Sequence, residues 1–520
     1  MTGKPHLKPI IYSTLSGLLL VAGWPTSPLV SLLFVGWVPL LVLHELSLTR
    51  LQKWAHTYWT LLIWNIGTTW WVCNASLWGG VAAIVLNALL MSVPWLIYHQ
   101  IKLKFNPFLG FLSLVVCWLG FEKIHLTWEL TWPWLTLGNG MAMYPKFVQW
   151  YSFTGHLGGS LWIWLVNLLL FMVLTVEARK WLSGAGLLLT VFMPLLWSMN
   201  HYNNAAVDAP TQINVAIVQP NIDPYNEKFQ GGNDAEQLAK FIKLSEQVVG
   251  SETALLLFPE TAIPTGVWKK SIGADENVNT LKEFLAQHEQ LNLLTGCSLI
   301  DESDSCTSSS AEPLGNSGKF YEVYNAALFL KNEQSPQYYI KSKLVPGVER
   351  MPYPGFFKFL KPLLINLGGS SQNLGTQPER TNFISDTFQI APVICYESVF
   401  GSYVAEYVRK GANLICIITN DGWWGDTEGH RQHLHYASLR AIETHRTIAR
   451  CANTGISCFI TERGDIQQAT NWWEASSLQR MVNLQHDETF FVRYGDLFEW
   501  EFVFGALIFV IAILLKRLLP

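Results

Sequence analysis

Three side chains in the second half of the chain could together make and break an acyl thioester: the carboxylate of Glu260, the ammonium of Lys341 and the thiol of Cys395. A free thiol has a pKa near 8.5 and needs a base or a positive neighbour before it attacks an ester. Glu260 could accept the thiol proton. Lys341 could stabilise the thiolate or a tetrahedral oxyanion, helped by a backbone N–H such as that of Tyr396.

Cys395 and Glu260 each have a simpler interpretation as well. Cys395 ends the apolar segment 388–394, where a cysteine is most often buried in the core. The segment runs into a polar stretch that begins at Tyr396, which places the thiol at a strand end, where open α/β sheets carry their sites. Glu260 also ends a strand-like segment and could be a solvated loop charge.

Lys341 and Lys343 alternate with Ile340 and Leu344, which predicts that both lysines lie on one face of a strand. Either could be a plain surface lysine. Taken singly, the three residues are weak indicators. Their order along the chain and their flanking residues together favour a catalytic role.

The elements that must position these residues alternate between strands and helices. Apolar segments predict buried strands at 213–219, 254–258, 291–299, 324–330, 389–395 and 413–419. Helical patterns occupy 235–249, 278–288 and 431–446, and Asp234 is a plausible N-cap of the first. This alternation predicts an α/β domain with both sheet faces covered. Residues 301–318 are rich in Ser, Asp and Glu and predict an exposed loop.

The composition is that of a membrane protein. Hydrophobic residues make up 50% of the chain and charged residues only 14%, and the 24 Trp are an excess expected at membrane interfaces. The net charge of −4 argues against nucleic acid as a partner. Apolar runs predict eight spans, near 9–26, 29–47, 56–75, 79–98, 107–122, 159–177, 182–199 and 498–515. We therefore expect a membrane domain of seven spans at 1–200, a catalytic domain at 201–497, and an eighth span with a short tail at 498–520.

Basic residues between the spans predict the orientation. With eight spans they all fall on one side, which the positive-inside rule makes the cytoplasm: Lys4, Lys8, Arg50, Lys53, Lys102, Lys104, Arg179, Lys180, Lys516 and Arg517. Both termini are then cytoplasmic, and the catalytic domain lies in the periplasm. The first span lacks a small-x-small cleavage site, so we expect it to be retained.

The other chemically notable residues leave alternatives open. Cys297 and Cys306 flank the polar loop and could form a disulfide. His430, His433 and His435 have a metal-like spacing but no suitably spaced carboxylate, so we predict no metal site. The remaining pattern is the pair Trp423 and Trp424 between glycines; these residues are either core aromatics or, as we favour, exposed beside the site.

Several motifs resemble one family, the bacterial apolipoprotein N-acyltransferases, and the resemblance covers nearly the whole chain. The matching stretches are Trp-Pro-Trp-Leu (132–135), Val-Gln-Pro-Asn-Ile (218–222), Phe-Pro-Glu-Thr-Ala-Ile-Pro (258–264), Lys-Ser-Lys-Leu-Val-Pro (341–346), Val-Ile-Cys-Tyr-Glu (393–397), Thr-Asn-Asp-Gly-Trp-Trp-Gly (419–425) and Asn-Thr-Gly-Ile-Ser (453–457). The order Glu, Lys, Cys is that of the nitrilase superfamily. The resemblance implies a four-layer αββα sandwich of nitrilase type, joined to eight membrane spans.

Roles for individual residues follow from the same resemblance. It implies that Glu260, Lys341 and Cys395 are catalytic, and that supporting roles fall to Glu349, Tyr396 and Glu397. Many relatives have Leu-Val-Pro-Phe-Gly-Glu where this chain has Leu-Val-Pro-Gly-Val-Glu (344–349), so the local turn differs. A tryptophan of the family has no direct match, and Tyr225 or Phe229 is nearest. The lipid-contact candidates are Phe229, Trp423 and Trp424.

The activity implied by the resemblance is a two-step acyl transfer at the bacterial inner membrane. A phospholipid would acylate the cysteine, and the acceptor would be the α-amine of a diacylglyceryl-modified N-terminal cysteine of an apolipoprotein. The resemblance implies a multi-pass monomer without cofactor. The alternatives are a membrane-tethered nitrilase-type amidase, an acyltransferase to another amine acceptor, and a catalytically silent scaffold.

Overall fold

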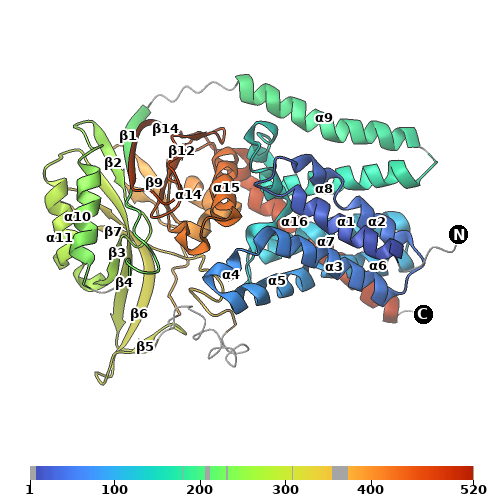
Figure 1. Cartoon of the computed structure of the whole chain (residues 1–520), viewed down its shortest axis with the longest axis horizontal. Helices are drawn as coiled ribbons and strands as arrows, with labels where there is room; N and C mark the ends of the chain where they lie inside the picture. The colour runs from blue at the N-terminus through green and yellow to red at the C-terminus, as the bar shows by residue number, and fades with distance from the viewer. Residues whose placement is uncertain are drawn as a thin grey trace. The chain divides into compact units, whose positions relative to one another are not determined.

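The computed structural model describes residues 7–178, 180–204, 211–229, 232–306, 308–353 and 373–518. Lys4 and Arg179, two of the charges that predict orientation, lie outside these residues. The chain divides into two compact units, one formed by Met1–Ala205 with Arg493–Pro520 and the other by Ala206–Val492 (Figure 1). The assignment of 1–200, 201–497 and 498–520 to membrane and periplasm stays a prediction.

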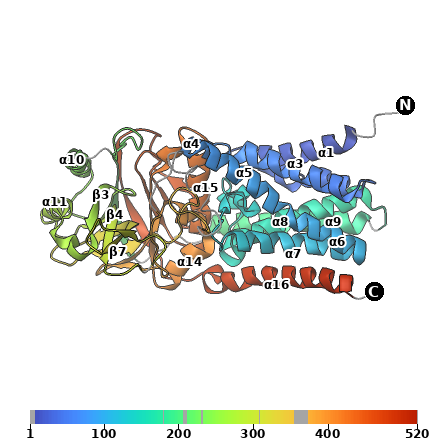
Figure 2. The same ribbon diagram turned by 90° about the horizontal axis from the view of Figure 1, so that it is seen from below.

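The first unit is helical. Its helices run side by side in Figure 2 and are α1 (Leu7–Ala22), η1 (Val30–Phe34), α2 (Val38–Glu45), α3 (Arg50–Thr69), α4 (Val72–Ala75), α5 (Leu77–Met91), α6 (Val93–Lys104), α7 (Pro107–His125), η2 (Pro133–Leu135), η3 (Leu137–Met141), η4 (Pro145–Phe147), α8 (Tyr151–Thr175), α9 (Lys180–Asn204) and α16 (Phe490–Leu518). Asn106 caps α7 by accepting a hydrogen bond from the Leu109 N–H at 2.9 Å. Prolines near the starts of α2, α6 and α7 suit the first helical turn, where no N–H partner is needed.

Five helical segments of the described chain are long and apolar enough to cross a membrane: Leu77–Lys104, Pro107–His125, Tyr151–Thr175, Lys180–Asn204 and Phe490–Arg517. Leu7–Ala22 and Val30–Glu45 are apolar but shorter. The predicted span 56–75 overlaps α3, which is not among the five. The count of eight spans stays a prediction.

Tryptophan forms much of the core of the helical unit. The excess of this residue predicted indole rings at membrane interfaces, yet six of them are buried in one cluster: Trp24, Trp37, Trp64, Trp95, Trp118 and Trp164. Trp37 lies at the centre, stacked on Trp164 with ring centroids 5.0 Å apart and edge-on to Trp118 at 5.1 Å. Edge-on and offset contacts of this kind are the favoured geometry of aromatic pairs.

The second unit contains two β-sheets. The larger has the order β14-β1-β2-β4-β6-β5, with β3 paired to β4 and β7 paired to β6; the smaller has the order β13-β12-β11-β10-β9-β8. The strands are β1 (Thr211–Gln219), β2 (Thr253–Leu257), β3 (Ile263–Trp268), β4 (Asn292–Ser303), β5 (Glu312–Pro313), β6 (Phe320–Leu330), β7 (Gln337–Ile340), β8 (Phe383–Ile384), β9 (Gln389–Ile394), β10 (Leu414–Thr419), β11 (Ile448–Ala452), β12 (Cys458–Ile460), β13 (Ile466–Gln467) and β14 (Ser476–Leu484). Strands β1, β2 and β4 are parallel, as are β9, β10 and β11.

Helices cover the outer face of each sheet, so the unit has four layers. α10 (Asp234–Ser245) and α11 (Glu276–Leu285) pack on the larger sheet, and α14 (Gly401–Arg409) and α15 (Glu428–Thr444) on the smaller (Figure 1). The inner faces of the sheets meet where the Cys451 thiol on β11 donates to the carbonyls of Val218 and Leu257. The predicted α/β fold, a nitrilase-like αββα sandwich beside an apolar helical part, is confirmed.

Two local predictions for this unit were wrong. β7 ends at Ile340, so Lys341 and Lys343 lie beyond the strand and do not share one of its faces. Lys341 is buried, whereas the Lys343 ammonium lies 5.0 Å from the centre of the Phe400 ring. Asp234 occupies the first turn of α10 rather than its N-cap, which is Asn233.

Candidate active site

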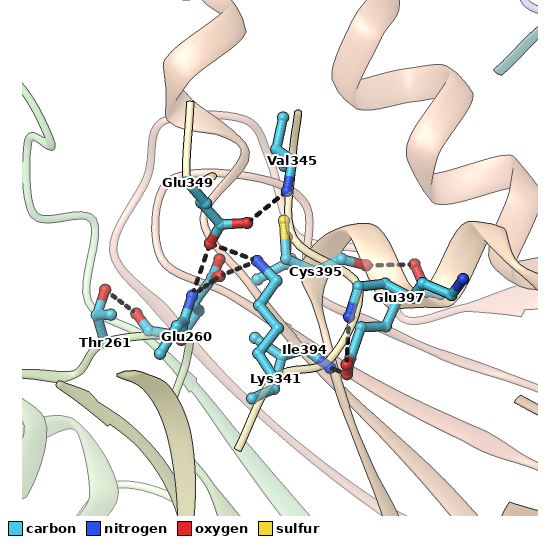
Figure 3. A network of polar contacts seen from close by, with 12 residues as sticks. Glu260, Thr261, Lys341, Val345, Glu349, Ile394, Cys395 and Glu397 are labelled. Atoms are coloured by element: carbon cyan, nitrogen blue, oxygen red, sulfur yellow. Dashed lines mark hydrogen bonds and ion pairs between the residues drawn. The ribbon is translucent and has the colours of Figure 1, made fainter. Parts of the chain in front are cut away.

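Cys395 lies at the point where a buried parallel strand ends. β9 stops at Ile394, and the five-residue 3-10 helix η7 (Cys395–Val399) follows at once. Cys395 has φ 48°, in the left-handed region that costs energy for any residue with a side chain. The side chain is 8% exposed. Figure 3 shows its sulfur on the side where Lys341, Glu260 and Glu349 gather.

Lys341 is the centre of a buried ion cluster. Its ammonium lies 3.0 Å from Glu260 Oε1 and 2.8 Å from Glu349 Oε1, and the residue is 1% exposed. Burial alone would lower the pKa of Lys341, but the charges of Glu260 and Glu349 raise it well above its ordinary value. Lys341 is therefore a fixed cation at neutral pH (Figure 3).

Asn325, on β6, joins the two carboxylates from the other side. Its Nδ2 group donates to Glu260 Oε1 at 2.7 Å and to Glu349 Oε1 at 3.1 Å. With the lysine, this amide fixes the carboxylate oxygens that face the site. The sequence analysis missed Asn325, although a lone polar residue inside the apolar strand 324–330 is the pattern that could have indicated it.

The backbone at Glu260 is held by close packing and by a second buried lysine. Thr261 has φ 48°, and Gly296 lies so close that a Cβ atom there would sit 2.7 Å from Glu260 Cα. Lys228 donates to the Glu260 carbonyl at 2.7 Å. Burial lowers the pKa of Lys228 to about 8, although Glu260 opposes this shift. Lys228 was also missed, because nothing in its local sequence predicts burial.

The thiol of Cys395 is protonated at rest. Burial raises its pKa, the negative charge of Glu260 raises it further, and Lys341 only partly offsets both effects. A base must therefore take the proton as the sulfur attacks. Glu260 is a carboxylate in this cluster that can act as this base.

Glu397 ties the cysteine turn to the lysine segment. Its Oε2 accepts a hydrogen bond from the Ile394 N–H at 2.9 Å, and its Oε1 accepts from the Ser342 N–H at 2.7 Å. The hydroxyls of Tyr339 and Tyr403 also donate to Oε1, each at 2.7 Å. Glu397 is fully buried, and burial raises its pKa. It supports the site by positioning both neighbours.

A second buried network holds the Cys395 carbonyl. Asp421 accepts from Arg450 at 2.5 Å and lies 3.0 Å from His433 Nδ1, while His433 Nε2 lies 3.2 Å from the Cys395 carbonyl. Ser398 donates to the same carbonyl at 2.7 Å. Burial would raise the pKa of Asp421, but Arg450 and His433 hold it far below its usual range.

The three histidines that suggested a metal site point to different neighbours. His433 belongs to the Asp421 network, and His430 stacks on Trp472 with ring centroids 3.8 Å apart. Burial lowers the pKa of His435 to about 4. Within the described ranges, no three His, Cys, Asp or Glu residues are grouped as metal ligands would be. Cys297 is buried and Cys306 exposed, and both thiols are free.

The predicted lipid-contact residues divide into two groups. Phe229 stacks on Trp423 with centroids 6.0 Å apart, and the Tyr225 hydroxyl donates to the Trp423 carbonyl at 2.6 Å. Tyr225 and Phe229 are 52% and 54% exposed, so this is an open aromatic surface. Trp424 instead contacts the His433 ring edge-on at 5.6 Å. Tyr396 is buried against Phe400.

Comparison with known proteins gives matches in both units. Residues 214–486 match the carbon–nitrogen hydrolase family, and residues 16–169 match the N-terminal domain of apolipoprotein N-acyltransferase. The apolipoprotein N-acyltransferase of Chlorobaculum tepidum is 34% identical, covering 94% of this chain and 93% of its own length; that of Geobacter metallireducens is 26% identical, covering 98% and 95%. The crystal structure of Saccharomyces cerevisiae Nit3, a member of branch 10 of the nitrilase superfamily, is 15% identical with a TM-score of 0.38 and covers 54% of this chain and 93% of that one.

The tight packing behind Glu260 leads to a test. In Gly296→Ala the new methyl group meets the backbone of Glu260 and Thr261, so we expect the carboxylate to shift and the rate of reaction to fall about 100-fold. Gly250→Ala is the control, because nothing lies within 4 Å of its added methyl group. The initial rates of both purified variants measure the effect. Equal rates for Gly296→Ala and Gly250→Ala would contradict the conclusion that close packing at Gly296 positions Glu260.

Lys228 supplies a second test. Lys228→Met removes the donor to the Glu260 carbonyl, and we expect a rate at least tenfold lower because the base loses its fixed position. Since the pKa of Lys228 is lowered to about 8, the wild-type rate should fall as the pH rises through about 8 and the ammonium loses its proton. The methionine variant should lack that step. Lys240→Met, which removes a longer contact of 3.4 Å to the Asn221 carbonyl, should keep the wild-type pH profile.

Proposed function

Because this chain belongs to the apolipoprotein N-acyltransferase family, we propose that it moves an acyl chain from a phospholipid onto Cys395 and from there to an apolipoprotein. The chain is an acyltransferase enzyme of lipoprotein biosynthesis with a carbon–nitrogen hydrolase domain. The observation that carries the thioester route is the buried cluster of Glu260, Lys341 and Glu349 beside a buried cysteine.

In the first half-reaction the sulfur of Cys395 attacks the ester carbonyl carbon of the phospholipid. Glu260 takes the Cys395 proton as the carbon–sulfur bond forms, and the carbonyl oxygen becomes a tetrahedral oxyanion. Lys341 and a backbone N–H such as that of Tyr396 stabilise this charge. The carbon–oxygen bond then breaks, Glu260 returns the proton to the leaving alkoxide, and a lysophospholipid departs.

In the second half-reaction the α-amine of a diacylglyceryl-modified N-terminal cysteine attacks the thioester. Glu260 takes a proton from the amine as the carbon–nitrogen bond forms, and Lys341 again stabilises the oxyanion. The carbon–sulfur bond breaks, the thiolate of Cys395 regains its proton, and the amide product leaves. The enzyme returns to its starting state after one acyl group has moved.

The ion cluster suits these two half-reactions because it has one cation and two carboxylates. Glu349 shares the charge of Lys341 and accepts the Val345 N–H at 2.8 Å, so it holds the lysine segment in place. Glu260 is then available as the base. The raised pKa of Cys395 keeps the thiol protonated until an ester is present.

The aromatic surface of Tyr225, Phe229 and Trp423 is the proposed contact for acyl chains. Phe229 directly follows Lys228, and Lys228 donates to the carbonyl of Glu260, the proposed base. The aromatic surface is therefore next to a residue that contacts Glu260. Trp424 packs on the network behind Cys395 and is assigned a supporting role instead. Apolar shielding of this kind would keep water from the thioester.

The chain is a membrane protein, and we propose that its catalytic unit lies in the periplasm of a bacterial inner membrane. The apolar helices and the family support the membrane location. The basic residues between helices support cytoplasmic termini. The proposed enzyme is a monomer and meets its phospholipid donor in the outer leaflet. The match of residues 16–169 favours the acyltransferase over a tethered amidase, which needs no such unit.

Loss of the nucleophile tests the proposed intermediate. Incubated with phospholipid, the wild-type protein should gain the mass of one acyl group on Cys395, measured by mass spectrometry of the intact protein and its peptides. Cys395→Ser should gain none, because an alcohol of ordinary pKa is a far poorer nucleophile. Cys416→Ser is the matched control, since Cys416 is buried on the neighbouring strand β10. An acyl group on another residue of the wild type would overturn the assignment.

Reporter fusions test the proposed orientation. Fusions after Arg50, Lys104 and Lys180 should score cytoplasmic, and a fusion within 301–318 should score periplasmic, because the positive-inside rule places the basic loops in the cytoplasm. A cytoplasmic score within 301–318 would show that the span count or the charge argument is wrong.

A further inference from the structure

A pocket lies in the helical unit between the C-terminal end of α2, the first turns of α3 and residues 95–100 of α6. Its volume is about 320 Å³, open space at its mouth included. The side chains that give it chemical character are His44, Arg50, Lys53, Trp54, Thr57 and His99. All belong to Met1–Ala205, so the pocket is separate from the cluster around Cys395.

The pocket lining carries positive charge, and Glu45, the acid that acts on Lys53, lies outside the lining. Arg50 and Lys53 are cations, and none of the residues that line the pocket is acidic. Glu45, at the end of α2, forms an ion pair with Lys102 on α6. Lys53 is repelled by Lys102 and attracted by Glu45. With the exposed Arg50, the group keeps an excess of positive charge that an anion would neutralise.

The floor of the pocket leaves ring nitrogens without partners. Thr57 donates its hydroxyl proton to the Lys53 carbonyl at 2.9 Å, so it accepts the N–H of His44 Nε2, also at 2.9 Å. Lys53 donates to the His44 carbonyl at 2.6 Å. His44 is 4% exposed, and its Nδ1 atom has no hydrogen-bond partner in the described part of the chain. The buried Nε2 atom of His99 has none there either.

Unpartnered buried nitrogens are costly, and here they lie in a pocket whose two charged lining residues are both cations. One bound anion would accept hydrogen bonds from Arg50 and Lys53, and its negative charge would favour protonation of His44 and His99, whose rings could then donate to it as well. The planar fork of an arginine matches the oxygens of a phosphate group, and tryptophan walls are common at the headgroup level of a membrane.

We propose that this pocket binds a phosphate group, carried by an anionic phospholipid headgroup or present as free phosphate. Basic pockets between membrane helices on the cytoplasmic side are suited to such headgroups. The pocket lies at the end of the unit where Lys104 on α6 donates to the Ile513 carbonyl near the end of α16. That is the end to which the basic residues assign the cytoplasm, whereas the acyl donor is proposed to bind on the opposite side.

Bound phosphate would stabilise the helical core. Trp95 lines the pocket and also contacts Trp37, the centre of the tryptophan cluster, with ring centroids 5.8 Å apart. A ligand that binds only the folded state raises the stability of that state by RT ln(1 + c/Kd), where c is the free ligand concentration. The expected role of the site is therefore to couple the stability of this unit to anionic lipid or phosphate.

Native mass spectrometry of the full-length protein in detergent tests the proposal. The probes are phosphatidylglycerol, phosphatidylethanolamine and inorganic phosphate, each titrated separately. In addition to the acyl-donor site, we expect one site that prefers phosphatidylglycerol or binds phosphate, and a dissociation constant for it that is at least tenfold higher in the double variant Arg50→Gln/Lys53→Gln. Lys516→Gln/Arg517→Gln removes the same charge from the end of α16 and should bind as the wild type does.

The probes also separate the two sources of phosphate. Binding of phosphatidylglycerol that millimolar inorganic phosphate does not displace identifies a lipid site, and binding of inorganic phosphate without lipid preference identifies a free-anion site. Acylation of Cys395 checks that each variant is folded. Should the double variant not fold, His99→Leu leaves both cations in place and must still weaken binding. Equal binding by wild type, His99→Leu and folded double variant would overturn the proposal.

Discussion

The active site depends on one buried ammonium. Lys341 lies between Glu260 and Glu349 at 3.0 and 2.8 Å and is almost fully excluded from solvent. Removing three charges from water is costly, so the arrangement persists only if every group is compensated. That requirement explains the surroundings: Asn325 donates to both carboxylates, and the Val345 N–H occupies the remaining Glu349 oxygen. A cluster completed in this way is rigid, and its cation stays available for an oxyanion.

The second constraint is the left-handed backbone at Cys395, which a strand end would not adopt unaided. Two networks hold it. Glu397 joins the end of β9 to the segment after Lys341, and Asp421, with His433 and Arg450, holds the Cys395 carbonyl. Because Glu397 contacts both the Cys395 turn and the segment after Lys341, movement of either would displace the other. The site is thus one body assembled from the ends of β2, β7 and β9.

The sequence predicts the residues whose role is visible locally and misses those that act only through tertiary contact. Glu260 and Cys395 follow apolar strands, so their places at strand ends could be predicted, and the αββα fold follows from alternating elements together with the family motifs. Asn325 and Lys228 gain their roles from partners 65 and 32 residues away. The tryptophans show the same limit, because composition cannot distinguish an interfacial ring from one of the six buried around Trp37. Lys341 was placed on a strand that ends one residue earlier, since alternation continues past the last paired residue.

We propose that Cys395 carries the acyl group and that the thioester waits for an amine rather than for water. The direct measurement is lysophospholipid release from phospholipid alone, followed with time against enzyme concentration. We expect a burst of about one equivalent and then a stall, because the first half-reaction acylates Cys395 and nothing removes the acyl group. A peptide with a diacylglyceryl-modified N-terminal cysteine should restart the release and yield an amide. Steady release of free fatty acid without any acceptor would contradict the account and identify a hydrolase.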